Sequence, residues 1–148
     1  MRVAIGSDHA GFALKEIIKA LLDELAVPYE DLGTATAQTV DYPDYAEAVG
    51  REVAAGRADR GILVCGTGIG MGIAANKVPG VRAAVAWDED SARLGRAHND
   101  ANIMALGGRT TPAGEVAAMV RAFLTTAYED GRHDARLEKI ARLERKDH

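Results

Sequence analysis

One stretch of the chain, residues 62–77 (ILVCGTGIGMGIAANK), restricts the fold more than any other. Its apolar residues run into the lone cysteine, Cys65, and glycine then occupies every second position up to an alanine-rich segment. This pattern predicts a buried strand, a tight turn and the start of a helix. The unpaired backbone N–H groups of a turn that leads into a helix favour an anion as ligand.

Short apolar segments alternate with segments of helical periodicity along the rest of the chain. We expect strands at residues 2–7, 27–32, 61–65, 82–86 and 102–106. Apolar side chains recur at helical spacing between and after them, which predicts helices at residues 14–25, 43–55, 91–97 and 116–124. Such alternation predicts an α/β fold, in which a five-stranded parallel sheet is covered by helices on both faces. A last amphipathic helix follows residues 131–134 as a C-terminal extension.

Composition narrows the class of protein. At 148 residues the chain has the size of a single domain, which we assign to residues 1–148. Its net charge of −4 gives no reason to expect nucleic acid as a partner. No apolar run approaches the roughly 20 residues of a membrane span, and the amino end lacks the layout of a signal peptide. A single cysteine excludes an internal disulfide, so we expect a cytoplasmic protein with a free thiol.

The glycine-rich turn does not match the commoner phosphate-binding motifs. A dinucleotide fingerprint that begins at Gly66 would need glycine at Met71, and one that begins at Gly68 would need glycine or alanine at Ile73. A Walker loop needs Gly-Lys-Ser/Thr, which is absent. A cysteine phosphatase loop needs arginine where Met71 stands. Cys65 therefore remains either a small buried residue or a nucleophile or base whose thiolate is favoured by the backbone N–H groups beside it.

Other polar residues flank the predicted strands. Ligands bind at the carboxyl ends of the strands in such sheets, and we expect a set of residues to meet there: Asp8, His9, Cys65, the glycines, His98 and Arg109. Asp8 could equally cap a helix, and His98 could equally lie at a helix end. Arg132 and Arg136 share a helix face and form either a phosphate clamp or a solvated basic face. No spacing predicts a metal site. We expect four further side chains to pack in the core: Met71, Trp87, Met104 and Met119.

Five motifs together resemble one family over essentially the whole chain. They are residues 6–11 (GSDHAG), 41–46 (DYPDYA), 65–77 (CGTGIGMGIAANK), 98–100 (HND) and 131–133 (GRH). Their order and spacing resemble the type B ribose-5-phosphate isomerases, a family that also holds allose-6-phosphate and galactose-6-phosphate isomerases. The resemblance implies a Rossmann-like α/β/α sandwich that interconverts an aldose phosphate and its ketose without a metal or other cofactor.

The resemblance also implies roles for individual residues. Cys65 would be the base that moves a proton between C2 and C1, because another branch of the family has a glutamate where Met71 stands here. Donors to the enediolate would come from Thr67 and from the backbone of the loop at Gly66, Gly68 and Gly70. His98 would help to open the sugar ring, while Asp8 and Asn99 bind hydroxyls. The phosphate would be bound by His9, Arg109, Arg132 and Arg136.

A homodimer or homotetramer with shared sites is implied as well. Arg132 and Arg136 would then come from the neighbouring subunit, and the extension at residues 131–148 would dock on it. Two alternatives remain: an isomerase of a different sugar phosphate, such as allose 6-phosphate, galactose 6-phosphate or a tetrose phosphate, or a regulator that binds a sugar phosphate without turning it over.

Overall fold

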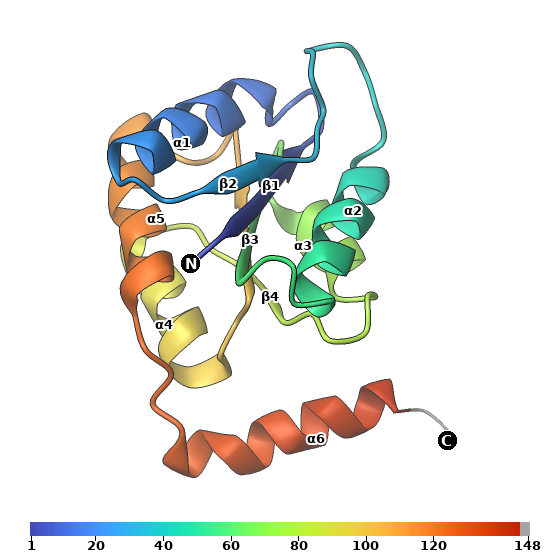
Figure 1. Ribbon diagram of the computed structural model, residues 1–148, viewed down its shortest axis with the longest axis vertical. Helices are drawn as coiled ribbons and strands as arrows, with labels where there is room; N and C mark the ends of the chain where they lie inside the picture. Colours follow the sequence, from blue (N-terminus) through green and yellow to red (C-terminus); the bar gives the residue numbers. More distant parts are fainter. Residues whose placement is uncertain (146–148) are drawn as a thin grey trace.

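The central sheet places all of its strands in parallel. The computed structural model describes residues 1–145 of the chain, so residues 146–148 of the predicted extension lie outside it. Within residues 1–145, five strands pair in the order β2-β1-β3-β5-β4 (Figure 1). They are β1 (Val3–Ser7), β2 (Tyr29–Asp31), β3 (Arg60–Cys65), β4 (Ala83–Val85) and β5 (Ile103–Gly107). The predicted five-stranded parallel sheet is confirmed.

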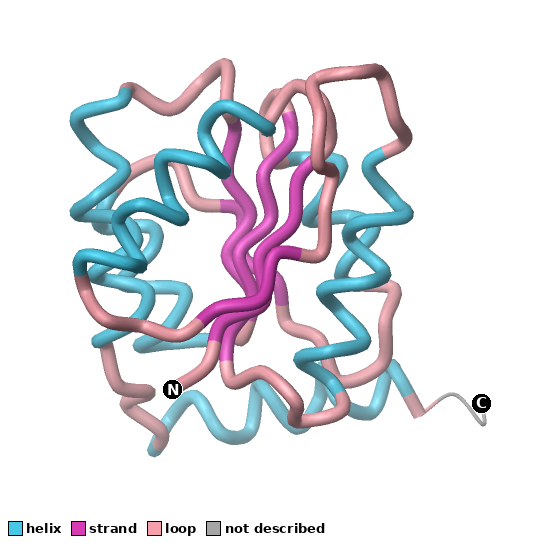
Figure 2. Tube along the Cα trace, turned by 45° about the horizontal axis from the view of Figure 1, so that its top comes forward, coloured by secondary structure: helices cyan, strands magenta, loops and turns pink. Residues whose placement is uncertain are grey.

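Helices cover both faces of this sheet. One face carries α1 (Phe12–Glu24), α4 (Glu89–Asn99) and α5 (Val116–Thr125), which bury their apolar stripes against alternate strand residues such as Ile5, Ile62 and Met104. The other face carries α2 (Tyr42–Ala54) and α3 (Ile69–Ala75), which pack against Ala4, Leu63 and Ile103. Figure 2 shows the strands as a middle layer between two layers of helices. The alternation of side chains along each strand therefore supplies two cores, and the α/β/α sandwich is confirmed.

Two expectations about individual segments were wrong. Trp87 follows β4 and is 69% exposed instead of packed in the core, whereas Met71, Met104 and Met119 are fully buried as expected. α4 is longer than residues 91–97 at both ends. Its first turn is fixed by a capping box between Asp88 and Ser91, and its last turn reaches Asn99.

The C-terminal extension lies below the amino ends of the strands. A short 3₁₀ turn, η2 (Gly131–His133), leads into α6 (Asp134–Glu144), which runs apart from the sandwich in Figure 1. α6 lies within the described residues and buries none of its side chains. Between this helix and the β4 edge is a cavity of about 840 Å³ that is lined in part by Ile140 and Leu143. No helix in residues 1–145 is long and apolar enough to cross a membrane.

The start of α1 packs directly on β3 at Gly11. A Cβ atom at this position would overlap with the backbone carbonyl of Val64. We expect Gly11→Ala to lower the free energy of unfolding by at least about 1–3 kcal/mol, the usual cost of overpacking, because backbone cannot move aside as a side chain can. Gly114→Ala is the matched control, since nothing lies within 4 Å of a Cβ there. Equal unfolding free energies for the two variants in urea would contradict this packing.

Candidate active site

A pocket of about 450 Å³ opens at the carboxyl ends of β1, β3 and β5. β1 and β3 are neighbours in the sheet, but their following loops lead to helices on opposite faces, which is where ligands bind in open α/β sheets. The pocket is lined by Asp8, His9, Ala10, Tyr42, Cys65, Gly66, Thr67, Ile69, Gly70, Ile73 and Arg109. The structure thus brings together seven of the twelve site residues that the sequence predicts.

Cys65 is buried at the end of β3, where the glycine loop bends around its sulfur. The backbone N–H of Gly68 donates a hydrogen bond to Cys65 Sγ at 3.1 Å. Gly68 has a φ of +82°, and a Cβ there would lie 2.9 Å from the backbone of Leu106. Only glycine combines this left-handed conformation with so close an approach. The loop therefore aims a backbone donor at the sulfur, a contact that a thiolate accepts well.

The end of β5 closes the pocket beside this loop. The backbone N–H of Gly108 donates to Cys65 O at 2.7 Å, and that of Arg109 donates to Gly66 O at 2.9 Å. These bonds continue the pairing of β3 with β5 into the loops. Arg109 is exposed, and among the described residues its guanidinium makes no ion pair. A cation and a thiol thus line the same pocket.

Asp8 and His9 contribute from the turn between β1 and α1. Asp8 is buried, and its Oδ1 accepts a hydrogen bond from the backbone N–H of Gly11 at 3.0 Å. Asp8 also lines the pocket, so its position is compatible both with starting the helix and with binding a ligand. Sequence reasoning missed Tyr42, whose ring packs on Gly70 across the pocket. Its place in the motif at residues 41–46 was the available signal.

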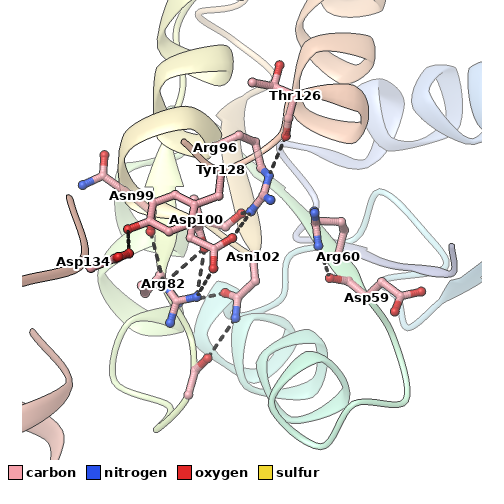
Figure 3. A network of polar contacts seen from close by, with 12 residues as sticks. Asp59, Arg60, Arg82, Arg96, Asn99, Asp100, Asn102, Thr126, Tyr128 and Asp134 are labelled. Atoms are coloured by element: carbon pink, nitrogen blue, oxygen red, sulfur yellow. Dashed lines mark hydrogen bonds and ion pairs between the residues drawn. The ribbon is translucent and has the colours of Figure 1, made fainter. Parts of the chain in front are cut away.

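His98 does not lie at the carboxyl ends of the strands, contrary to our expectation, and neither does its neighbour Asn99. Both belong to the last turn of α4, which precedes β5, so they stand at the opposite edge of the sheet from Cys65. Figure 3 shows the polar network that holds this turn. Arg82 donates to the carbonyls of Asn99 and Asp100, and Arg96 Nη1 donates to Asp100 Oδ1 at 2.8 Å.

The segment after α5 returns to this turn and forms a second polar cluster. The backbone N–H of Glu129 donates to Ala97 O, and the ring of His133 stacks on that of His98 with centroids 4.5 Å apart. Arg132 and Arg136 lie beside His133, and Arg136 Nη1 donates to Arg132 O. Among residues 1–145 neither guanidinium has a carboxylate partner. We call these five residues the His98 cluster: His98, Glu129, Arg132, His133 and Arg136.

The His98 cluster contains a group of metal-ligand type that the sequence did not predict. The ligand atoms of His98, Glu129 and His133 lie within 4.8 Å of one another. The planes of the two imidazole rings are only 21° apart, so their in-plane lone pairs do not converge on one ion. Glu129 Oε1 lies 3.8 Å from Nε2 of each histidine, and His133 Nε2 is buried without a hydrogen-bond partner among the described residues. This arrangement suits the holding and transfer of a proton better than metal binding.

His133 makes stability depend on pH. Burial lowers its pKa, and the nearby charges of Arg132 and His98 lower it further, against an opposing effect of Glu129. The unfolded chain therefore binds a proton first as the pH falls below about 6.5, and the free energy of unfolding should fall from there until the folded-state pKa is passed. Urea unfolding at several pH values between about 8 and 5 should show a smaller decrease for His133→Gln than for the native chain. Parallel curves for the two proteins would contradict this expectation.

Comparisons with known proteins agree with these observations. The ribose/galactose isomerase family matches residues 3–140. The chain is 46% identical over 145 residues to ribose-5-phosphate isomerase B of Escherichia coli. This alignment covers 98% of this chain and 97% of the relative. It is also similar to the structure of ribose-5-phosphate isomerase B from Clostridium thermocellum, with a TM-score of 0.97, 44% identity and full coverage of both chains.

Another solved structure includes a ligand. It is ribose-5-phosphate isomerase B from Mycoplasma genitalium with bound ribulose-5-phosphate, which matches with a TM-score of 0.93 and 41% identity over 98% of this chain and 97% of that one. The resemblance to type B ribose-5-phosphate isomerases that the motifs suggest is confirmed. The chain is an isomerase that belongs to the ribose/galactose isomerase family.

Proposed function

We propose that the protein interconverts ribose 5-phosphate and ribulose 5-phosphate, with Cys65 as the base. The observation that carries the proposal is the pocket in which the thiol of Cys65, the backbone of the glycine loop and the guanidinium of Arg109 border one space. A base, donors for a developing oxyanion and a cation for a phosphate are the three groups that this reaction needs. The names of the Escherichia coli and Mycoplasma genitalium proteins favour the pentose phosphates as the substrate pair.

In this mechanism, the thiolate of Cys65 takes the proton from C2 of the open-chain aldose and returns it to C1. The C2–H bond breaks and a C1–H bond forms, while a hydroxyl proton moves from O2 to O1, so atoms and charge balance. Negative charge develops on the substrate oxygens of the enediolate. Because the N–H of Gly68 is bound to sulfur, the donors to these oxygens are the N–H groups of Gly66 and Gly70 and the hydroxyl of Thr67.

The pocket residues that remain bind the rest of the substrate. Asp8 has one carboxylate oxygen engaged by Gly11, which leaves the other for a sugar hydroxyl. His9 and Arg109 bind the phosphate. Binding energy from a phosphate far from the reacting carbons serves to orient C1 and C2 against the base.

The His98 cluster acts in the pocket of a neighbouring subunit. Within one chain it stands at the other edge of the sheet from Cys65, and its two arginines, which make no ion pair with a carboxylate of residues 1–145, are suited to a phosphate. The pocket is flanked by Ile69 and Ile73, which are 58% and 60% exposed and offer an apolar surface for a second copy. In a dimer, or a tetramer built from dimers, His98 opens the sugar ring, Asn99 binds a hydroxyl, and Arg132 and Arg136 complete the phosphate site.

The extension fits the same assembly. α6 leaves Ile140 and Leu143 exposed along a cavity, and this face docks on the partner subunit in our proposal. A thiol that serves as a base has to stay reduced, which is why we assign the activity to the cytoplasm.

Proton NMR of ribose 5-phosphate with the protein in D₂O tests this function. We expect signals of ribulose 5-phosphate to appear while the C2 proton signal of the aldose disappears through exchange with solvent. Unphosphorylated ribose serves as the control and should react far more slowly. Turnover of allose 6-phosphate or galactose 6-phosphate in place of ribose 5-phosphate would contradict the assigned substrate. Binding of sugar phosphates by calorimetry without any turnover would contradict catalysis.

A further inference from the structure

One fully buried lysine is not part of the pocket lining. Lys15 lies in the first turn of α1 and is 0% exposed. Its Nζ donates to Asp31 Oδ1 at 2.7 Å and to the backbone carbonyl of Thr34 at 2.6 Å. A buried ammonium group is tolerated only where its protons have partners. Lys15 therefore joins α1 to the end of β2 and to the loop that follows.

That loop, residues 33–41, starts from a fixed position. The backbone N–H of Gly33 donates to Asp31 Oδ1 at 2.9 Å, and the N–H of Thr34 donates to Ser7 O at 2.8 Å. Burial would raise the pKa of Asp31, but the hydrogen bonds from Lys15, Lys19 and Gly33 lower it overall, so the carboxylate stays charged. Lys15 is the group that holds both this carboxylate and the Thr34 carbonyl.

The loop ends against His9. The backbone N–H of Val40 donates to His9 Nδ1 at 3.2 Å. A neutral imidazole that accepts at Nδ1 carries its proton on Nε2, so this bond selects one tautomer of a residue that lines the pocket. Tyr42, two residues further along, lines the same pocket. The loop thus reaches from the buried lysine to two pocket side chains.

We propose that Lys15 is a positioning residue that, by anchoring the 33–41 loop, holds His9 as the Nε2–H donor to an oxygen of the substrate phosphate. This inference rests on the proposed function and deepens it. Removal of the ammonium group frees the Thr34 carbonyl, lets the loop shift and weakens the bond from Val40 to His9. A displacement of about 1 Å far from the reacting atoms is enough to lower a rate by roughly 10²-fold.

Lys15→Met tests the proposal, because methionine keeps the length of the side chain without the charge. We expect kcat/KM for ribose 5-phosphate to fall by up to about 10²-fold, mainly through KM. In ¹⁵N NMR, His9 should change from a single Nε2–H tautomer to a mixture of tautomers. Lys19→Met is the matched control. Lys19 pairs with the same Asp31 at 2.9 Å, but within residues 1–145 it donates no hydrogen bond to the loop backbone, and it is partly exposed, so both readouts should stay close to the native values.

Three outcomes would overturn the proposal. One is an Nδ1–H tautomer of His9 in the native protein, a measurement that needs neither the variant to fold nor the enzyme to turn over. A second is an unchanged His9 tautomer in folded Lys15→Met. The third is an equal effect of Lys15→Met and Lys19→Met. Failure of the proposed function itself would be distinguishable, since native protein would then leave ribose 5-phosphate unchanged whatever the tautomer of His9.

Discussion

Cys65→Ala should lower kcat for ribose 5-phosphate by roughly 10²–10⁴-fold, the range that a positioned acid or base contributes. The pocket keeps its shape in this variant, because the backbone bonds from Gly108 and Arg109 to the loop do not involve the sulfur. Substrate binding should therefore change little, so that kcat falls while KM stays nearly constant. Steady-state kinetics together with calorimetric titration of ribose 5-phosphate provide the measurement.

Exchange of the C2 proton with solvent D₂O tests directly whether Cys65→Ala has lost the base. If Cys65 is the base, loss of the C2 proton signal and formation of ribulose 5-phosphate should disappear together. Cys65→Ser is the control of similar shape, and it should also be strongly impaired because a hydroxyl ionises far less readily than a thiol. An alanine variant that exchanges the C2 proton at the native rate would exclude Cys65 as the base while leaving the family assignment intact.

A mixture of Cys65→Ala and His98→Asn subunits should recover activity that neither variant has alone. The structure separates the two residues to opposite edges of the sheet in one chain, so the proposed site takes Cys65 from one subunit and His98 from another. Random pairing into dimers makes half of them mixed, and each mixed dimer has one intact site of two. We therefore expect about a quarter of the native activity after the subunits are unfolded and refolded together.

Cys65→Ala mixed with Thr67→Ala provides the matched control for this experiment. Both residues line the same pocket, so every pocket in a mixed dimer carries a defect and no recovery is expected. Recovery in the control, or its absence in the first mixture, would contradict sites shared between subunits. Light scattering on the same samples reports whether the subunits associate as dimers or tetramers.

Much of the site could be predicted from the chain because strand ends are local features. Cys65 is the last residue of β3, and Arg109 follows the end of β5 by two residues. The carboxyl ends of parallel strands meet at one edge of the sheet, so both residues could be placed there. His98 was placed at the wrong edge of the sheet. It precedes the predicted strand at residues 102–106, and the structure puts it in the last turn of α4, which extends to Asn99 and is closed by Asp100 at a φ of +47°.

The sequence by itself determined the order of strands and helices along the chain, a sheet covered by helices on both faces, and the loop around Cys65. These features follow from hydrophobic periodicity and glycine positions, which are patterns of a few neighbouring residues. Only the tertiary structure decided what lies close in space but far apart in the chain. It put Trp87 on the surface, stacked His133 on His98, brought Tyr42 into the pocket and buried Lys15 beneath the 33–41 loop. These contacts depend on how helices pack across the sheet, and no local pattern of residues encodes that packing.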